Sequence, residues 1–195
     1  MESSGLWKRT LAAAINDTDT VDRERLRDAL RKFRSRVSDL VDSIAHELPG
    51  LTVHDITHLD ALWDVADEVL GLDYPINPAE AFVLGGAILL HDAAHAVAAY
   101  EGGLSEIKSS SEWRDFIALR LNAVEPATGS PEEKVALFHV LRQLHAHQAE
   151  KLPWVSWKDA AGNPAFLIED AELRNYFGCA IGMVAASHHW DVGMV

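Results

Sequence analysis

The sequence of 195 residues predicts an all-α fold, a single-domain helical bundle. Apolar residues recur at spacings of three and four in several segments, which is the period of a helix with one buried face. Helix start and stop signals flank these segments, and almost none shows the two-residue alternation of a strand. The length and the hydrophobic content of 48% are typical of one globular domain with a sizeable core.

The first predicted helix runs from about residue 21 to residue 48. Asp19-Thr20 offers an N-cap, and Pro49-Gly50 stops the helix. We therefore divide the chain into an N-terminal amphipathic helical segment, residues 1–50, that packs on the core, and a main helical domain, residues 51–195. The apolar stripe of this helix comprises Leu26, Leu30, Phe33, Val37, Leu40, Ile44 and Leu48.

The main domain is expected to contain five further helices. Gly71 ends the first of them, and Pro78 opens the next at a position where its missing N–H does no harm. Ser130-Pro131-Glu132-Glu133 has the pattern of a capping box with proline at the first helical position. We predict helices over about 54–70, from 78 past 92, and over 113–121, 131–152 and 169–189, with a polar stretch at 102–111 and a loop at 153–164.

Composition excludes several classes of function. The chain has 30 acidic and 17 basic residues, a net charge of −13, which disfavours broad nucleic-acid binding. No apolar stretch approaches the roughly 20 residues of a membrane span, and the N-terminus lacks a secretory signal. The single cysteine, Cys179, leaves no intrachain disulfide, as is typical of a reducing compartment. The expectation is a cytoplasmic protein without a membrane partner.

A histidine and an aspartate, His91-Asp92, directly follow a long apolar run from Ala81 to Leu90. Burying an imidazole and a carboxylate is costly unless something pairs with them. A divalent cation would do so, because histidine nitrogen and carboxylate oxygen are its usual ligands. A His-Asp pair that is hydrogen-bonded inside a helical core is the alternative, and the dipeptide alone leaves both open.

The other histidines favour the metal. His58, His145 and His188 each fall in phase with apolar residues, so we expect them to point inward. His91 and His95 are one helical turn apart and are expected to share a face. Four helices could then direct histidines to one interior point, as metal-binding bundles do. The three stripes are His58-Leu62-Val65-Val69, Phe138-Leu141-His145-Ala149-Leu152 and Phe177-Ile181-Val184-His188.

This ordered set resembles the HD superfamily of metal-dependent phosphohydrolases over about residues 51–191. The resemblance is carried by Thr52-Val53-His54-Asp55-Ile56-Thr57-His58 and Ile88-Leu89-Leu90-His91-Asp92, and the downstream motifs Arg142-Gln143-Leu144-His145 and Ala186-Ser187-His188-His189 are similar to the extra histidines of binuclear, HD-GYP-like members. A Gly-Tyr-Pro element is absent from the sequence, so cyclic dinucleotides are not implied.

The resemblance implies a ligand set and a fold of the HD-domain type. It implies two divalent transition-metal ions, manganese, iron, nickel or zinc, with magnesium an alternative. Asp92 would bridge the ions, and catalytic contacts to phosphate or to the leaving oxygen would come from Asp92, His95, His54 and His189. The implied metal ligands are His58, His91, Asp92, His145, His188 and, as the family's closing aspartate, Asp191.

The implied activity is hydrolysis of a phosphomonoester or phosphodiester, in a nucleotide or a similar small molecule, by a metal-activated hydroxide. The alternative is a catalytically weak regulatory or ligand-sensing module of a larger protein, and a metal-free helical interaction domain is the third reading. In larger relatives the closing aspartate comes well downstream of the last histidines. We therefore expect a chain truncated at its C-terminus, which acts with further domains or as a homodimer.

Overall fold

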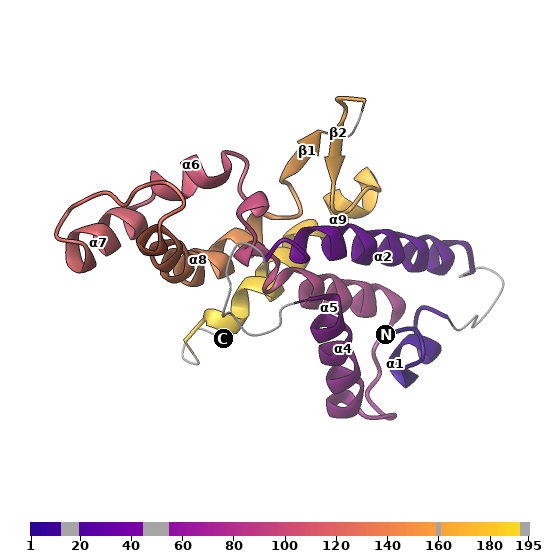
Figure 1. The fold of residues 1–195 in the computed structure, drawn as a ribbon. Coiled ribbons are helices and arrows are strands. Elements are labelled where there is room, and N and C mark those ends of the chain that lie inside the picture. Colours follow the sequence, from indigo (N-terminus) through magenta and orange to yellow (C-terminus); the bar gives the residue numbers. More distant parts are fainter. Residues whose placement is uncertain (13–19, 45–54, 159–160, 192–195) are drawn as a thin grey trace.

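The computed structural model describes residues 1–12, 20–44, 55–158 and 161–191, and it confirms the all-α class (Figure 1). The regular secondary structure of the described ranges is helical apart from one small antiparallel sheet of two strands. Its elements are α1 Gly5–Arg9, α2 Thr20–Val41, α4 Ile56–Leu70, α5 Pro78–Leu90, the 3-10 turns η1 Ala93–His95 and η2 Val97–Ala99, α6 Gly103–Lys108, α7 Ser111–Arg120, α8 Pro131–Lys151, β1 Ser156–Lys158, β2 Pro164–Phe166, α9 Ala171–Ala186 and the 3-10 turn η3 Ser187–His189.

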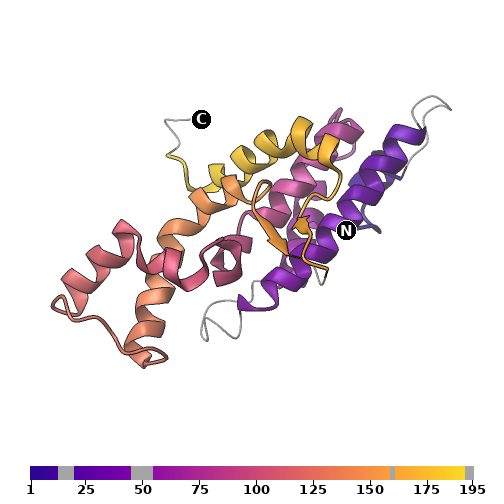
Figure 2. The same ribbon diagram turned by 90° about the horizontal axis from the view of Figure 1, so that it is seen from above.

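Helix α5 lies at the centre of the body, packed against α2, α4 and α9 (Figures 1 and 2). Two glycines allow these neighbours to approach. A Cβ at Gly85 would lie 2.7 Å from the ring of Trp63, and one at Gly86 would lie 2.9 Å from Ile181. Because partners cover α5 on several sides, its sequence is apolar almost throughout, as the run before His91 indicated.

The N-terminal helices pack on this body. The predicted apolar stripe of α2 is buried from Leu26 to Leu40, and the helix ends at Val41. Its predicted continuation is wrong at residues 42–43, which form a turn, although Ile44 of the predicted stripe is buried; residues 45–48 and the N-cap expected at Asp19 lie outside the described residues. Helix α1 contacts α4, where the rings of Trp7 and Trp63 meet edge to face with centroids 6.4 Å apart.

The starts of α5 and α8 agree with the predicted proline positions, and the cap of α8 differs in one contact. Asn77 and Glu80 form a capping box at the start of α5, with Pro78 at the first position. At the start of α8, Ser130 accepts from the backbone N–H of Glu133 as predicted. The Glu133 carboxylate, however, accepts from the N–H of Gly129, one residue before the cap.

The chain between residues 91 and 95 is the most consequential departure from the predicted helices. Helix α5 ends at Leu90, and His91 is its C-cap. Asp92 adopts φ −108° and ψ −5°, and the chain turns into η1. The prediction that His91 and His95 share one face of a continuous helix is therefore wrong. Because the helix breaks after Leu90, His95 reaches Asp92 from the 3-10 turn instead.

Two predicted loops contain regular structure. The polar stretch 102–111 includes α6, and the stretch 153–164 includes β1, which pairs with β2 so that Trp157 lies opposite Ala165. Trp157 also donates its indole N–H to the carbonyl oxygen of Ala98 at 2.8 Å. Such short elements depend on tertiary partners, which local sequence patterns do not reveal.

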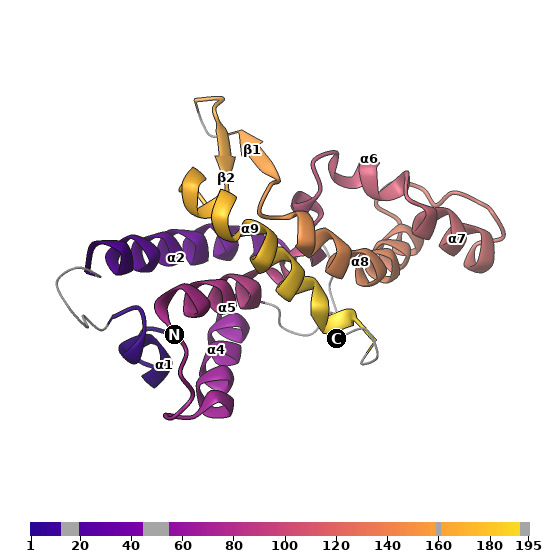
Figure 3. The ribbon, with the colours of Figure 1, turned by 180° about the vertical axis from the view of Figure 1, so that it is seen from behind.

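Helices α6 and α7 and the first turns of α8 project from the body as an arm (Figures 1 and 3). Along its length α8 joins this arm to the core, where it packs against α9. No helix in the described ranges combines the length and the apolar character that a membrane crossing requires.

A glycine at the α8–α9 crossing provides a test of this arrangement. A Cβ on Gly182 would lie 2.3 Å from the backbone oxygen of Glu150, so Gly182→Ala must force the two helices apart. We expect the substitution to lower the free energy of unfolding by about 1–3 kcal/mol, although alanine has the better helix propensity. Urea denaturation measures this change.

The matched control is Ala180→Ser, at an exposed position of the same helix. It should stay within about 0.5 kcal/mol of the wild type. A Gly182→Ala variant as stable as the wild type would show that α8 and α9 do not meet this closely.

Candidate metal centre

The carboxylate of Asp92 lies at the centre of a cluster of histidines, and its two oxygens face different partners. Oδ2 lies 2.9 Å from Nε2 of His91 and 3.9 Å from Nε2 of His58. Oδ1 lies 3.7 Å from Nε2 of His95 and 3.8 Å from Nε2 of His145. Asp92 is 9% exposed, so this carboxylate is largely removed from water and surrounded by imidazoles.

His58 enters from the first turn of α4. The N-cap Asp55 fixes this turn by accepting from the backbone N–H groups of Thr57 and His58. The hydrogen bond that the Thr57 hydroxyl donates to Asp55 is the largest cause that lowers the pKa of Asp55, and the two backbone hydrogen bonds lower it further.

The predicted apolar stripe through His58 is wrong. Val65 and Val69 are 51% and 79% exposed, and α4 instead buries Leu59 and Trp63. His58 therefore lies at the edge of the buried face and reaches Asp92 with a side chain that is 35% exposed.

His145 and His188 approach each other from α8 and from the turn after α9. His145 is 4% exposed, and its predicted stripe on α8 is confirmed by the buried Leu141, Ala149 and Leu152. His188 lies in η3 and is exposed, contrary to the inward-facing stripe predicted for it, yet its Nε2 lies 3.1 Å from Nε2 of His145. The two rings thus meet at the mouth of the cluster.

Three of the histidines are oriented in the same way. Nδ1 of His91, His145 and His188 each lies within hydrogen-bond distance of the backbone oxygen three residues earlier, on Ile88, Arg142 and Ala185 respectively. A carbonyl oxygen only accepts, so Nδ1 must carry a proton, and Nε2 faces the centre. Metal-binding histidines commonly use this second hydrogen bond to fix their tautomer.

The facing lone pairs of His145 and His188 require a positive charge between them. Burial, foremost, lowers the pKa of His145 to about 4, and burial likewise lowers the pKa of His188, so a proton is disfavoured near neutral pH. A metal ion meets the requirement, because two nitrogens about 2.0–2.1 Å from one tetrahedral ion lie roughly 3.3 Å apart. The donor set therefore fits a metal ion.

His91 shows the opposite balance. Burial lowers its pKa, but the hydrogen bond to Asp92 and the charge of that carboxylate outweigh the burial, and the pKa is raised overall. In the metal-free protein, Asp92 and His91 therefore partly satisfy each other. A cation that binds at this point has to replace a proton on His91.

The ligand atoms form three overlapping groups, each within 4.8 Å: His58, His91 and Asp92; Asp92, His95 and His145; and His145, His188 and His189. Asp92 and His145 each belong to two groups. This overlap provides donors for more than one ion around a shared carboxylate. The predicted site residues His58, His91, Asp92, His95, His145, His188 and His189 are thus brought together.

Two further predicted site residues, Asp191 and His54, are not among the ligands of these groups, the second because its placement is not described. Asp191 is described and exposed, and its carboxylate belongs to none of the three groups. His54 falls in the stretch 45–54, outside the described residues. Both assignments stay predictions.

Sequence reasoning missed the backbone part of the site. Within the described ranges, no further histidine, cysteine, aspartate or glutamate joins the three groups. What was missed is the set of carbonyl oxygens on Ile88, Arg142 and Ala185. For His91 and His188 a signal existed, since the last carbonyls of a helix have no helical partner and are free to accept from a side chain that follows.

The depressed pKa of His145 predicts how acid affects the metal-free protein. An unfolded histidine titrates near its ordinary value of 6.5, whereas folded His145 titrates near 4. Between these pH values the unfolded chain binds the proton that the folded chain excludes, so the free energy of unfolding should fall as the pH drops through this window. Urea titrations at a series of pH values measure the slope.

His145→Gln should flatten this pH dependence, because glutamine does not titrate. His147→Gln is the control, since His147 is exposed on the same helix, two residues away. An unchanged slope in His145→Gln would show that His145 is not held neutral by burial.

Comparison with known proteins places this geometry in a family. No curated protein and no solved structure matches the chain. The family model HD-CE matches residues 48–195, which include every residue of the cluster around Asp92. The match agrees with the HD-type motifs of the sequence, while the HD-GYP-like subtype stays a prediction. Because the match covers well over half of the chain, the protein belongs to the HD-CE family of HD-type domains.

Proposed function

We propose that this protein is a metal-dependent phosphohydrolase that acts on a nucleotide or a similar small phosphoester. The observation that carries the proposal is that the two carboxylate oxygens of Asp92 face different partners. Oδ2 faces His58 and His91, and Oδ1 faces His95 and His145. A carboxylate placed in this way can be shared by two cations a few ångströms apart. Membership of an HD-type family supports the same reading.

Two divalent ions, when bound, would lower the pKa of water towards about 7 and neutralise charge on the phosphoryl oxygens. The nitrogen-rich donor set suits manganese, iron, nickel or zinc better than magnesium, which prefers oxygen ligands. We assign His58 and His91 to one ion and His145 and His188 to the other. Asp92 would be shared between them.

The remaining histidines differ in access to a substrate. His189 is exposed, and its ring centroid lies 4.5 Å from that of His145, so it can meet a phosphate at the mouth of the site. His95 is 3% exposed and stacks on His145 with centroids 4.1 Å apart. We therefore propose His189 as the proton donor to the leaving oxygen, and His95 as a group that supports the shared carboxylate.

The charge of the site favours an anionic substrate despite the acidity of the chain. The net charge of −13 repels phosphates at long range. Within the cluster, however, one carboxylate accompanies six histidines. Two divalent ions would leave this site strongly positive, so the substrate is expected to bind through its phosphate.

Asp92→Asn tests the shared carboxylate. Asparagine keeps the volume but not the charge, so the variant should fold, lose most of its bound metal and hydrolyse phosphoesters at least about 100-fold more slowly. Elemental analysis after purification without chelator, and a phosphoester panel with added manganese, measure the two effects. Asp73→Asn, at an exposed position away from the cluster, is the control. Equal metal content and equal rates for Asp92→Asn and wild type would remove Asp92 from the site.

His145→Ala and His188→Ala test the number of ions. If these histidines hold the second ion, each variant should lower the metal content from two equivalents towards one and abolish hydrolysis. His147→Ala, on the same helix as His145 but exposed, should keep two equivalents. One equivalent of metal in the wild type and in both variants alike would leave a one-metal site built on His58, His91 and Asp92.

The same measurements separate an enzyme from a regulatory module. Turnover of any phosphoester that disappears in Asp92→Asn supports the proposed activity. Stoichiometric metal binding without turnover across the panel would instead favour a ligand-sensing domain, and a protein that binds no metal would contradict both.

A further inference from the structure

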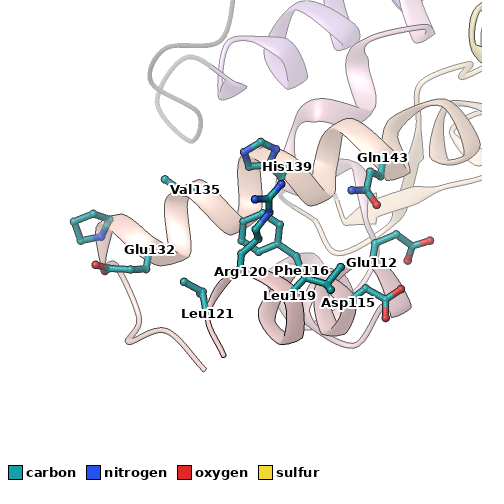
Figure 4. A pocket seen from close by; sticks show the side chains of 11 residues that line it. Glu112, Asp115, Phe116, Leu119, Arg120, Leu121, Glu132, Val135, His139 and Gln143 are labelled. Atoms are coloured by element: carbon teal, nitrogen blue, oxygen red, sulfur yellow. The ribbon is translucent and has the colours of Figure 1, made fainter. Parts of the chain in front are cut away.

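A groove of about 800 Å³ lies between α7 and α8, on the arm that projects from the body (Figures 1 and 4). Its apolar lining includes Phe116, Leu119, Leu121 and Val135. Leu119 and Val135 are 81% and 52% exposed. Clustered exposed apolar side chains in a groove, as distinct from single ones, mark a surface that binds another molecule.

Carboxylates lie at both ends of this groove. Figure 4 shows Glu132 at one end and Glu112 with Asp115 at the other, while Arg120 lies between them beside His139. Among the described residues, none of the three carboxylates forms an ion pair with a basic side chain. With three carboxylates and one arginine, the rim carries a net negative charge.

Some half-buried carboxylates elsewhere in the protein are already neutralised by an arginine. Those near α2 are paired at short range, for example Asp60 with Arg34 and Asp170 with Arg25, at 2.6 and 2.7 Å. The groove thus combines apolar lining residues with carboxylates that form no ion pair among the described residues. Together these features select a ligand with apolar side chains between basic ones.

The shape of the groove indicates a helix. Its α8 wall extends from Glu132 to Gln143, a rise of roughly 16 Å at 1.5 Å per residue, or about three helical turns. An amphipathic helix laid along such a wall presents apolar side chains at every third or fourth position. Basic residues at the two ends of that helix would meet the carboxylates at the two ends of the groove.

We propose that the α7–α8 groove binds a basic amphipathic helix of a partner polypeptide. Apolar contacts with Leu119 and Val135 supply most of the affinity, and the rim carboxylates steer and select a cationic partner. A second copy of this chain fits poorly. Each copy carries a net charge of −13, and arginines such as Arg25 and Arg34 are already ion-paired. Binding of a helix in this groove does not require the proposed hydrolase activity.

A synthetic peptide tests the proposal. The probe is a fluorescein-labelled helix of about 14 residues, with leucines along one face and lysines at both ends, and its partner in the comparison carries glutamates in place of the lysines. Fluorescence anisotropy should give a Kd on the order of 10 µM for the lysine peptide at low salt. Binding of the glutamate peptide should be at least about tenfold weaker. Added salt should weaken binding of the lysine peptide more than binding of the glutamate peptide.

Methyl NMR locates the bound peptide. Signals of Leu119 and Val135 should shift on titration with the lysine peptide, whereas methyl groups of the metal centre such as Ile88 should not. Leu119→Asp changes an exposed position, so it should fold normally and weaken binding at least about tenfold.

Charge removal tests the rim. The triple variant Glu112→Gln, Asp115→Asn and Glu132→Gln should weaken binding of the lysine peptide by about tenfold at low salt. Binding of the glutamate peptide should not become weaker. Circular dichroism before the titration verifies that α7 and α8 remain folded.

The matched control removes three exposed carboxylates elsewhere, in the variant Asp22→Asn, Glu68→Gln and Asp73→Asn. Its Kd should stay within about twofold of the wild type. Equal binding of the two peptides, absence of shifts at Leu119 and Val135, or equal loss in both triple variants would overturn the proposal. Concentration-dependent dimerisation that Leu119→Asp abolishes would also overturn it, since the groove would then bind a second copy.

Discussion

The position of the Asp92 carboxylate is the constraint on which the site depends. Helix α5 is buried on several sides, and its end at Leu90 delivers His91 and Asp92 into the interior. The chain then leaves the helical path, and His95 returns to the same carboxylate from a 3-10 turn. A buried carboxylate requires partners, and here each of its oxygens faces imidazole nitrogens from different segments. A continuous helix through residues 91–95 would not produce this arrangement.

Close packing of the helices holds the distant ligands in place. His58, His145 and His188 come from α4, α8 and the turn after α9, which are separated by other elements or many residues along the chain. Gly86 lets α9 approach α5, and Gly182 lets α9 approach the backbone of α8. Interiors packed in this way transmit small displacements, so the positions of His145 and His188 follow from the helix crossing as much as from their own rotamers.

The positions of the protons on the histidines of the cluster agree with metal binding. The carbonyl oxygens of Arg142 and Ala185 hold the Nδ1 protons of His145 and His188, which leaves their Nε2 lone pairs opposed at 3.1 Å. Burial, the largest cause, lowers the pKa of both rings, so neutral pH does not supply a proton to separate them. A cation removes this repulsion. The same physics explains why six histidines can gather around a single carboxylate among the described residues.

The sequence by itself determined the helical class, the start of α5 at Pro78, the buried stripe of α8 around His145 and the position of His91 and Asp92 at the end of a buried apolar run. These features follow from local caps and from hydrophobic periodicity, which act within a few residues. Only the tertiary structure decided the break after Leu90, the exposed face of Val65 and Val69 on α4, the exposed position of His188 and the strands in residues 156–166. Each depends on which surfaces the neighbouring helices cover, and periodicity cannot identify the partner that covers a face.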